Sequence, residues 1–161
     1  MAGLLARLAS ERDADVTLVS MTTRRSDELY DSARALGLAR AVVLDGIESI
    51  SETTEAELDR VIAAAFDELD PDVVVGFGPE GITGNPEHQA AGLAVWRTFL
   101  RRGRGMLLRA VMPRELNDMV SKHSAANEPG WGIGPILRVP LGSAGELRRA
   151  SADCYRALEE A

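Results

Sequence analysis

The chain has 161 residues, of which 45% are hydrophobic and 27% charged, so one soluble domain with its own core is expected. The formal net charge of −7 argues against a nucleic-acid partner, because binding to polyphosphate normally needs a basic stripe. One cysteine excludes an internal disulfide, and no apolar run is long enough to cross a membrane. The amino terminus resembles neither a signal nor a transit peptide, so a cytoplasmic location is expected.

Helix-type and strand-type patterns alternate in the first half of the chain. Apolar spacing and β-branched runs predict helices over residues 2–11 and 27–36, and strands over residues 16–22 and 41–44. Thr54 and Glu57 have the spacing of a capping box, and they precede a helix that is expected to continue to about Leu69.

The same alternation continues after Pro71, which is expected to end that helix. A strand is predicted over residues 73–77, a helix from Asn85 to about Arg102, and a strand over residues 105–112. Beyond these elements the patterns predict a loop over 117–133, a short strand over 136–141 and a closing helix over 145–158.

Alternating helices and apolar strands predict an α/β fold, with a mostly parallel sheet covered by helices on both faces. A doubly wound domain usually opens with a strand, whose carboxyl end helps to form the ligand crevice. This sequence opens with a helix pattern. Either the fold has an unusual start, or a first strand and the loop after it are missing. Residues 1–161 are interpreted as a single domain that is N-terminally incomplete.

The segment from Gly78 to Asn85 follows a strand and precedes a helix, which is where open parallel sheets bind ligands. Gly81 and Gly84 are expected to adopt positive φ angles in a tight connection. Asn85 has a simple structural role as the helix N-cap, with proline at the first helical position.

Two further residues of this segment lie in the first helical turn. Glu87 suits the positive end of the helix dipole, which is a structural role. His88 is expected to project towards the crevice, where it could be a hydrogen-bonded structural residue or a metal ligand. The other histidine, His123, is 35 residues away without a ligand motif beside it.

Outside this segment the candidates are fewer. Arg24 and Arg25 follow the predicted strand at 16–22, where they could bind an anionic group or simply form a solvated turn. Trp96 and the apolar stripe around it are expected to lie in the core. No nucleotide-phosphate motif and no nucleophile elbow occurs in the sequence.

Taken together, the stretch DVVVGFGPEGITGNPEHQAAGLAV resembles a signature of the LmbE-like (PIG-L) family of zinc-dependent N-acetylglucosamine deacetylases. The family has a strand, a Gly-Pro-Asp-Gly type of turn and then His-Pro-Asp-His at the start of a helix. The resemblance extends over about residues 2–102. It implies a Rossmann-like fold and the hydrolysis of an acetamide on an amino sugar conjugate, with zinc polarising the carbonyl and its bound water.

Residue by residue, the resemblance implies that His88 is a zinc ligand. Asn85 stands where the family has its first histidine, and Glu87 stands where it has the aspartate, so these two are the catalytic candidates. Substrate binding is assigned to residues of the same crevice edge, namely Arg24, Arg25, Gly81 and Thr83.

The family's His-Pro-Asp-Asp motif, which supplies two zinc ligands and the base, does not occur in the sequence. The chain is therefore expected to be an incomplete, inactive deacetylase that does not retain zinc, and that self-associates through exposed strand edges as a homo-oligomer. The alternative is a non-catalytic domain of the family that binds a small molecule or a partner. A third interpretation is an unrelated α/β domain that binds an anion through Arg24, Arg25 and the Gly78–Gly84 segment.

Overall fold

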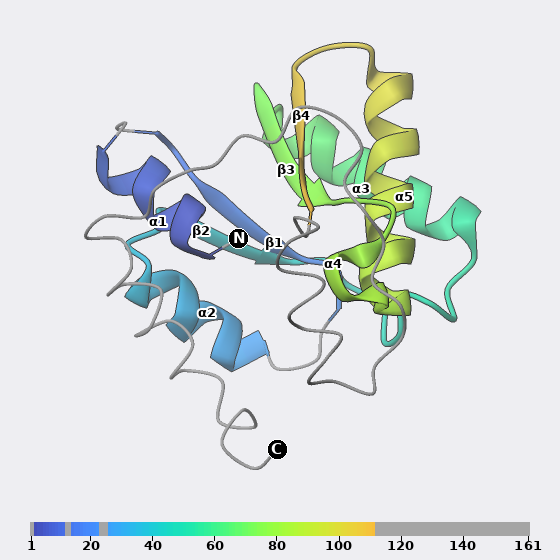
Figure 1. Ribbon diagram of the computed structural model, residues 1–161, viewed down its shortest axis with the longest axis horizontal. Helices are drawn as coiled ribbons and strands as arrows, with labels where there is room; N and C mark the ends of the chain where they lie inside the picture. Colours follow the sequence, from blue (N-terminus) through green and yellow to red (C-terminus); the bar gives the residue numbers. More distant parts are fainter. Residues whose placement is uncertain (1, 12–13, 23–25, 112–161) are drawn as a thin grey trace. The chain divides into compact units, whose positions relative to one another are not determined.

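The computed structural model describes residues 2–11, 14–22 and 26–111 (Figure 1). The described residues up to Glu48 belong to one compact unit and those from Ser49 onwards to a second. The loop, strand and helix predicted within 117–158 lie outside the described residues, as do Arg24 and Arg25. The single domain over 1–161 stays a prediction.

The described residues of the first unit form two helices and two strands: α1 (Ala2–Glu11), β1 (Thr17–Ser20), α2 (Ser26–Ala35) and β2 (Arg40–Val43). β1 and β2 are parallel, with Thr17 opposite Arg40 and Ser20 opposite Val43. The α2 helix connects them and packs against β2. Ala6 of α1 and Leu36, which follows α2, are almost completely buried and form a small cluster with Leu38.

The second unit contains three helices and two strands among the described residues: α3 (Glu55–Leu69), β3 (Val73–Phe77), α4 (Gly81–Gly84), α5 (Pro86–Arg102) and β4 (Met106–Ala110). β3 and β4 are parallel, with Val73 opposite Met106 and Phe77 opposite Ala110. The α5 helix connects the two strands and packs against both of them and against α3 (Figure 1).

The helix ends of the second unit follow local signals in the sequence. The Thr54 hydroxyl accepts a hydrogen bond from the Glu57 N–H (3.3 Å), which is the N-cap bond expected from the capping-box spacing. At the other end of α3, Asp70 adopts a left-handed conformation (φ 42°) and donates its N–H to the Phe66 carbonyl. Gly103 closes α5 in the same way, with φ 70°.

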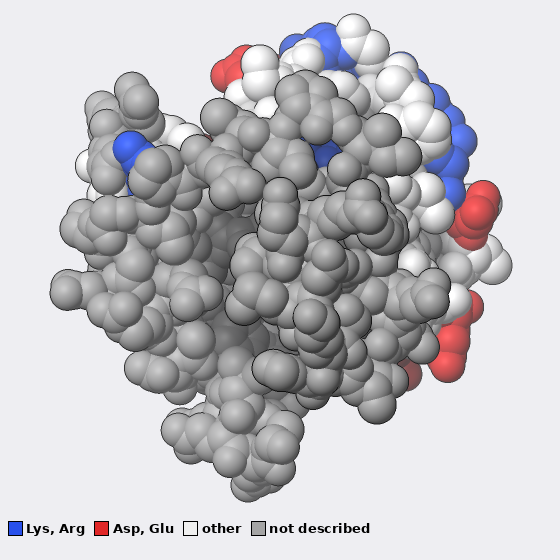
Figure 2. Space-filling view, viewed as in Figure 1, with Lys and Arg blue, Asp and Glu red and all other residues white. Residues whose placement is uncertain are grey.

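Ion pairs join α3 to α5. Asp59 of α3 is 8% exposed, and its carboxylate accepts hydrogen bonds from Arg97 (2.9 and 3.1 Å) and Arg101 (2.6 Å). Burial raises the pKa of Asp59, but the two arginines lower it by more, so the net shift is downward. At the end of α3, Asp70 pairs with Arg102 and Arg104. Figure 2 shows basic and acidic side chains next to each other along the described margin of the surface.

The prediction that Trp96 lies in the core is wrong. Trp96 is 42% exposed, and Leu93 and Leu100 on the same helix are also exposed. The buried face of α5 consists instead of small residues: Ala91, Gly92, Ala94 and Thr98. Small side chains let the helix approach β3 and α3 closely, and the large apolar side chains are left on another face.

The predicted α/β architecture with parallel strands and connecting helices is confirmed. Every helix and strand predicted between residues 2 and 111 is present with only small shifts at its ends. Among the described residues the strands pair as β1–β2 and β3–β4.

Candidate functional site at the carboxyl end of β3

The chain leaves β3 through a tight turn. The Gly78 N–H donates to the Ala110 carbonyl (2.9 Å), which extends the β3–β4 pairing by one bond. The Gly81 N–H then donates to the Gly78 carbonyl (2.9 Å), so residues 78–81 form a β-turn. Pro79 occupies its second position, and Glu80, with φ −79° and ψ −9°, occupies the third as in a type I turn.

A single left-handed helical turn, α4, follows this β-turn. Gly81, Ile82 and Gly84 have φ angles of 64°, 65° and 72°, and the Gly84 N–H donates to the Glu80 carbonyl (3.1 Å). The positive φ angles predicted for Gly81 and Gly84 are confirmed. The helical turn itself was not predicted, and Ile82 is an unexpected member, because a β-branched residue is strained in this region. Thr83 lies in the same turn.

Gly81 packs directly against the start of α5. A Cβ atom at this position would lie 2.9 Å from Gln89 Cγ and 3.1 Å from His88 Cβ. Glycine is therefore required here both by its φ angle and by the lack of space.

The His88 ring is held by two contacts. It stacks on the Phe77 ring, with 4.1 Å between the ring centroids and 9° between the planes. Its Nδ1 lies 3.2 Å from the Gly81 carbonyl oxygen. A carbonyl oxygen only accepts hydrogen bonds, so Nδ1 is the donor in this contact and Nε2 is the ring nitrogen that does not take part in it. A metal-binding histidine is commonly oriented by a bond of this kind from its other nitrogen.

The Glu87 carboxylate binds the segment that precedes α3. It accepts hydrogen bonds from the hydroxyls of Ser49 (2.9 Å) and Ser51 (2.5 Å) and from the N–H groups of Ile50 (2.7 Å) and Ser51 (3.2 Å). Burial raises the pKa of Glu87, but these four bonds outweigh it and lower the pKa to about 2. A general base works best with a pKa near the working pH, so this carboxylate is poorly suited to that role.

Asn85 is the N-cap of α5, as predicted. Its side-chain oxygen accepts hydrogen bonds from the N–H groups of Glu87 (2.8 Å) and His88 (3.4 Å), and Pro86 follows at the first helical position. The cap fixes the first turn of α5 and thereby the backbone that carries His88.

Glu80 is the member of this segment that sequence reasoning missed. The residue is only 8% exposed, and its Oε1 is buried without a hydrogen-bonding partner among the described residues. No sequence signal distinguishes it from an ordinary turn residue, because its burial depends on how Gly78 and α4 fold around it.

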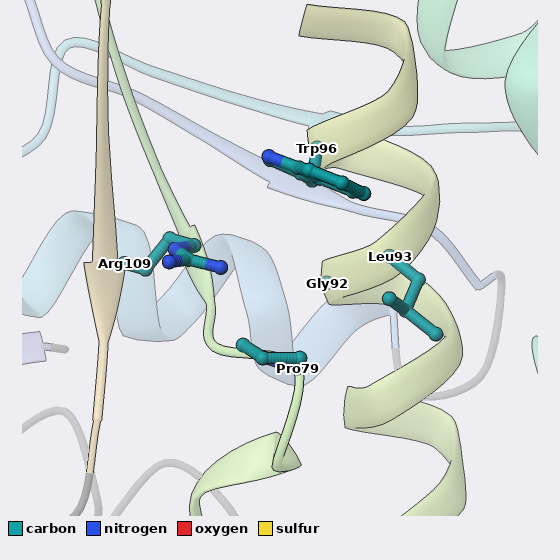
Figure 3. A pocket seen from close by; sticks show the side chains of 5 residues that line it. All are labelled: Pro79, Gly92, Leu93, Trp96 and Arg109. Carbon is teal, nitrogen blue, oxygen red and sulfur yellow. The ribbon is translucent and has the colours of Figure 1, made fainter. Parts of the chain in front are cut away.

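A small hollow of about 140 Å³ lies beside the β-turn that follows β3, on the exposed side of α5. Its wall is formed by Leu93, Trp96 and Gly92 from α5, with Pro79 from the turn and Arg109 from β4 (Figure 3). Figure 3 shows the Arg109 side chain and the Trp96 ring on opposite sides of this space.

The described residues do not bring together three or more histidine, cysteine, aspartate or glutamate side chains that could hold a metal ion. The Nδ1 contact of His88 is of the kind that orients metal-binding histidines, but the described part of the chain does not provide the rest of a zinc coordination shell. No catalytic step through a metal follows from this arrangement. The predicted roles of His88, Asn85, Glu87, Gly81 and Thr83 stay predictions.

The family model described as GlcNAc-PI de-N-acetylase, PIG-L, matches residues 1–99, which is more than half of the chain. The chain belongs to the PIG-L family. The resemblance inferred from the Gly78–His88 segment is therefore confirmed, and the PIG-L match includes the β3 turn, α4 and the first three turns of α5.

A solved structure supports the PIG-L fold. The N,N'-diacetylchitobiose deacetylase from Pyrococcus horikoshii, complexed with its inhibitor MPG, is 17% identical to this chain with a TM-score of 0.56. The match covers 99% of this chain and 68% of that one, and at this identity it concerns the fold alone. No curated protein matches the sequence. No helix in the described ranges has the length and apolar character of a membrane span.

Proposed function

We propose that this protein binds an amino sugar conjugate of the kind on which de-N-acetylases act, and that residues 1–161 by themselves do not hydrolyse its N-acetyl group. The first part rests on membership of the PIG-L family, whose description names a de-N-acetylase. The observation that carries the assignment to this segment is the contact of His88 Nδ1 with the Gly81 carbonyl oxygen, which leaves Nε2 as the ring nitrogen available to a ligand. The site lies at the carboxyl end of a parallel strand, where ligands of such sheets bind.

The second part rests on the bonds that the other candidates make. The Asn85 side chain caps α5, and the Glu87 carboxylate already accepts four hydrogen bonds from residues 49–51. Neither group is placed to activate water. These contacts favour the alternative of a non-catalytic binding domain over an active hydrolase made from these residues alone. Among the described residues, His88 is the one candidate ligand for the zinc that the family resemblance implies.

The expected partner is a small amino sugar conjugate, with a cytoplasmic location and without a nucleic-acid or membrane partner. The negative net charge supports the exclusion of nucleic acid. Among the described residues, β1 and β3 each pair with one other strand and so have one unpaired edge. A homo-oligomer would cover such edges.

The test combines metal analysis with an activity assay. We expect purified protein, loaded with zinc and then desalted, to contain well below one equivalent of zinc by mass spectrometry. We also expect it to release no acetate from an N-acetylglucosamine conjugate. Glu52→Gln, an exposed substitution outside the site, is the matched control for His88→Gln. Stoichiometric zinc together with acetate release, both lost in His88→Gln but kept in the control, would show that the chain is an active deacetylase.

A further inference from the structure

The Glu80 side chain combines deep burial with an unused hydrogen-bonding group. Only 8% of the residue is exposed, and Oε1 has no donor within reach among the described residues. An acceptor that is buried without a donor destabilises a folded protein, and native structures keep few of them. Such a group needs a physical reason, and a bound ligand that supplies the donor is one.

Among the described residues of the second unit, the other acidic side chains with little exposed surface are all satisfied. Asp59 accepts hydrogen bonds from two arginines, and Glu87 accepts four hydrogen bonds from one loop. The described part of the second unit therefore provides donors to its other carboxylates of low exposure, and Glu80 is different.

Glu80 is held in one position by its surroundings. A Cβ atom at Gly78 would lie 2.5 Å from both Glu80 carboxylate oxygens, so these oxygens lie against the bare Cα of Gly78. The Glu80 backbone is fixed at the third position of the β-turn, and its carbonyl accepts the Gly84 N–H. The acceptor is thus oriented in advance at the carboxyl end of β3, one residue before the Gly81 carbonyl that orients His88.

The chemistry of the group limits what can bind it. A carboxylate only accepts hydrogen bonds, so the missing partner is a hydroxyl, an N–H group or a cation. Among the described residues, no group of three or more histidine, cysteine, aspartate or glutamate side chains could hold a metal ion. A sugar offers several hydroxyl donors on neighbouring carbons.

We propose that Glu80 Oε1 accepts a hydrogen bond from a hydroxyl group of the amino sugar and thereby sets the orientation of the sugar ring. This inference rests on the proposed function and adds a sugar-binding residue to it. Glu80 is a binding residue here and takes no part in bond cleavage.

The first measurement is the thermal stability of the protein without ligand. Glu80→Met removes both oxygens at similar length, so the unmet acceptor disappears, and we expect Tm to rise by about 3–6 °C. Glu52→Met, on an exposed residue of the same unit, is the matched control, and we expect a change within about 1 °C. A fall in Tm for Glu80→Met would mean that the carboxylate is satisfied in the free protein and would overturn the inference.

The second measurement is an NMR titration with N-acetylglucosamine, followed through backbone amide shifts. We expect wild type and Glu52→Met to bind with millimolar dissociation constants, and Glu80→Met to bind at least about tenfold more weakly. Glu80→Gln keeps one acceptor oxygen, so its affinity is expected to lie between those two values. Equal binding by wild type and Glu80→Met would refute the role of Glu80 while leaving the proposed function intact.

Two other results have a definite meaning. If no variant and not even the wild type binds the sugar, the proposed function fails, and a Tm rise in Glu80→Met would still establish the unmet acceptor. If zinc ions raise the Tm of wild type but not of Glu80→Met, the ligand is a cation, and the assignment to a sugar hydroxyl is overturned.

Discussion

Replacing Glu87 with glutamine should remove a large share of the stability of the second unit. The carboxylate receives four hydrogen bonds, from Ser49, Ile50 and Ser51, and its pKa falls from 4.5 to about 2. At about 1.4 kcal/mol per pKa unit, this difference corresponds to about 3 kcal/mol, which partial exposure reduces to about 2–3 kcal/mol. The glutamine amide has one acceptor oxygen and would turn its NH2 group towards at least one of the donors.

The pH dependence of this contribution follows from the direction of the shift. Because the folded-state pKa of Glu87 is lowered, its contribution is complete above about pH 4.5 and disappears as the pH falls towards 2. More than half of it should be lost at pH 3. Above pH 5 the wild type should therefore exceed Glu87→Gln in unfolding free energy by about 2–3 kcal/mol, with a smaller difference at pH 3.

Urea unfolding of both proteins at pH 7, 5, 4 and 3 measures this difference. Glu52→Gln is the matched control, since Glu52 lies in the same loop and is exposed. A difference that stays constant across this pH range, or that is below about 0.5 kcal/mol at pH 7, would refute the assignment of these four bonds to an ionised carboxylate.

Three further substitutions test other parts of the second unit. Asn85→Ala should lower the unfolding free energy by about 1 kcal/mol, because it removes the N-cap of α5. Asn85→Asp should keep the wild-type stability, because aspartate also caps helices, and thermal unfolding compares the two variants. Ile82→Gly should raise the unfolding free energy by about 1 kcal/mol in urea unfolding, because glycine relieves the left-handed strain at φ 65°; a loss of stability would show that the Ile82 side chain contributes more than the strain costs. Asp59→Asn should cost about 3 kcal/mol in urea unfolding at pH 7, because it removes the largely buried anion that Arg97 and Arg101 share; equal stability of the variant would count against this pairing.

Much of the fold was predictable because its signals are local. The Asn85-Pro86 pair predicted the start of α5, and Gly103 ends that helix within one residue of the expected position. The parallel β3–β4 pair follows from two apolar runs separated by a helix, since this connection favours parallel strands. The segment at the carboxyl end of β3 was therefore located correctly from sequence alone.

The details of that segment were not predictable, because they depend on contacts between residues far apart in the chain. Glu87 follows the pattern of a helix-dipole residue, yet its carboxylate reaches a segment 36 to 38 residues earlier. Ile82 gives no sign that it adopts a positive φ angle, since β-branched residues normally avoid this region. The periodicity of α5 predicted an apolar stripe correctly but assigned Trp96 to the wrong side of the helix.

Gly92 lies one helical turn beyond His88 and touches the end of β3. A Cβ atom there would lie 2.7 Å from the Phe77 carbonyl oxygen and 2.9 Å from that of Gly78. Alanine would force the helix away from the strand, and the imidazole would lose its place over the Phe77 ring. A change of one methyl group at a distance from the imidazole would thus alter its orientation, so screens for altered ligand preference in this protein should include position 92 as well as the residues around the imidazole.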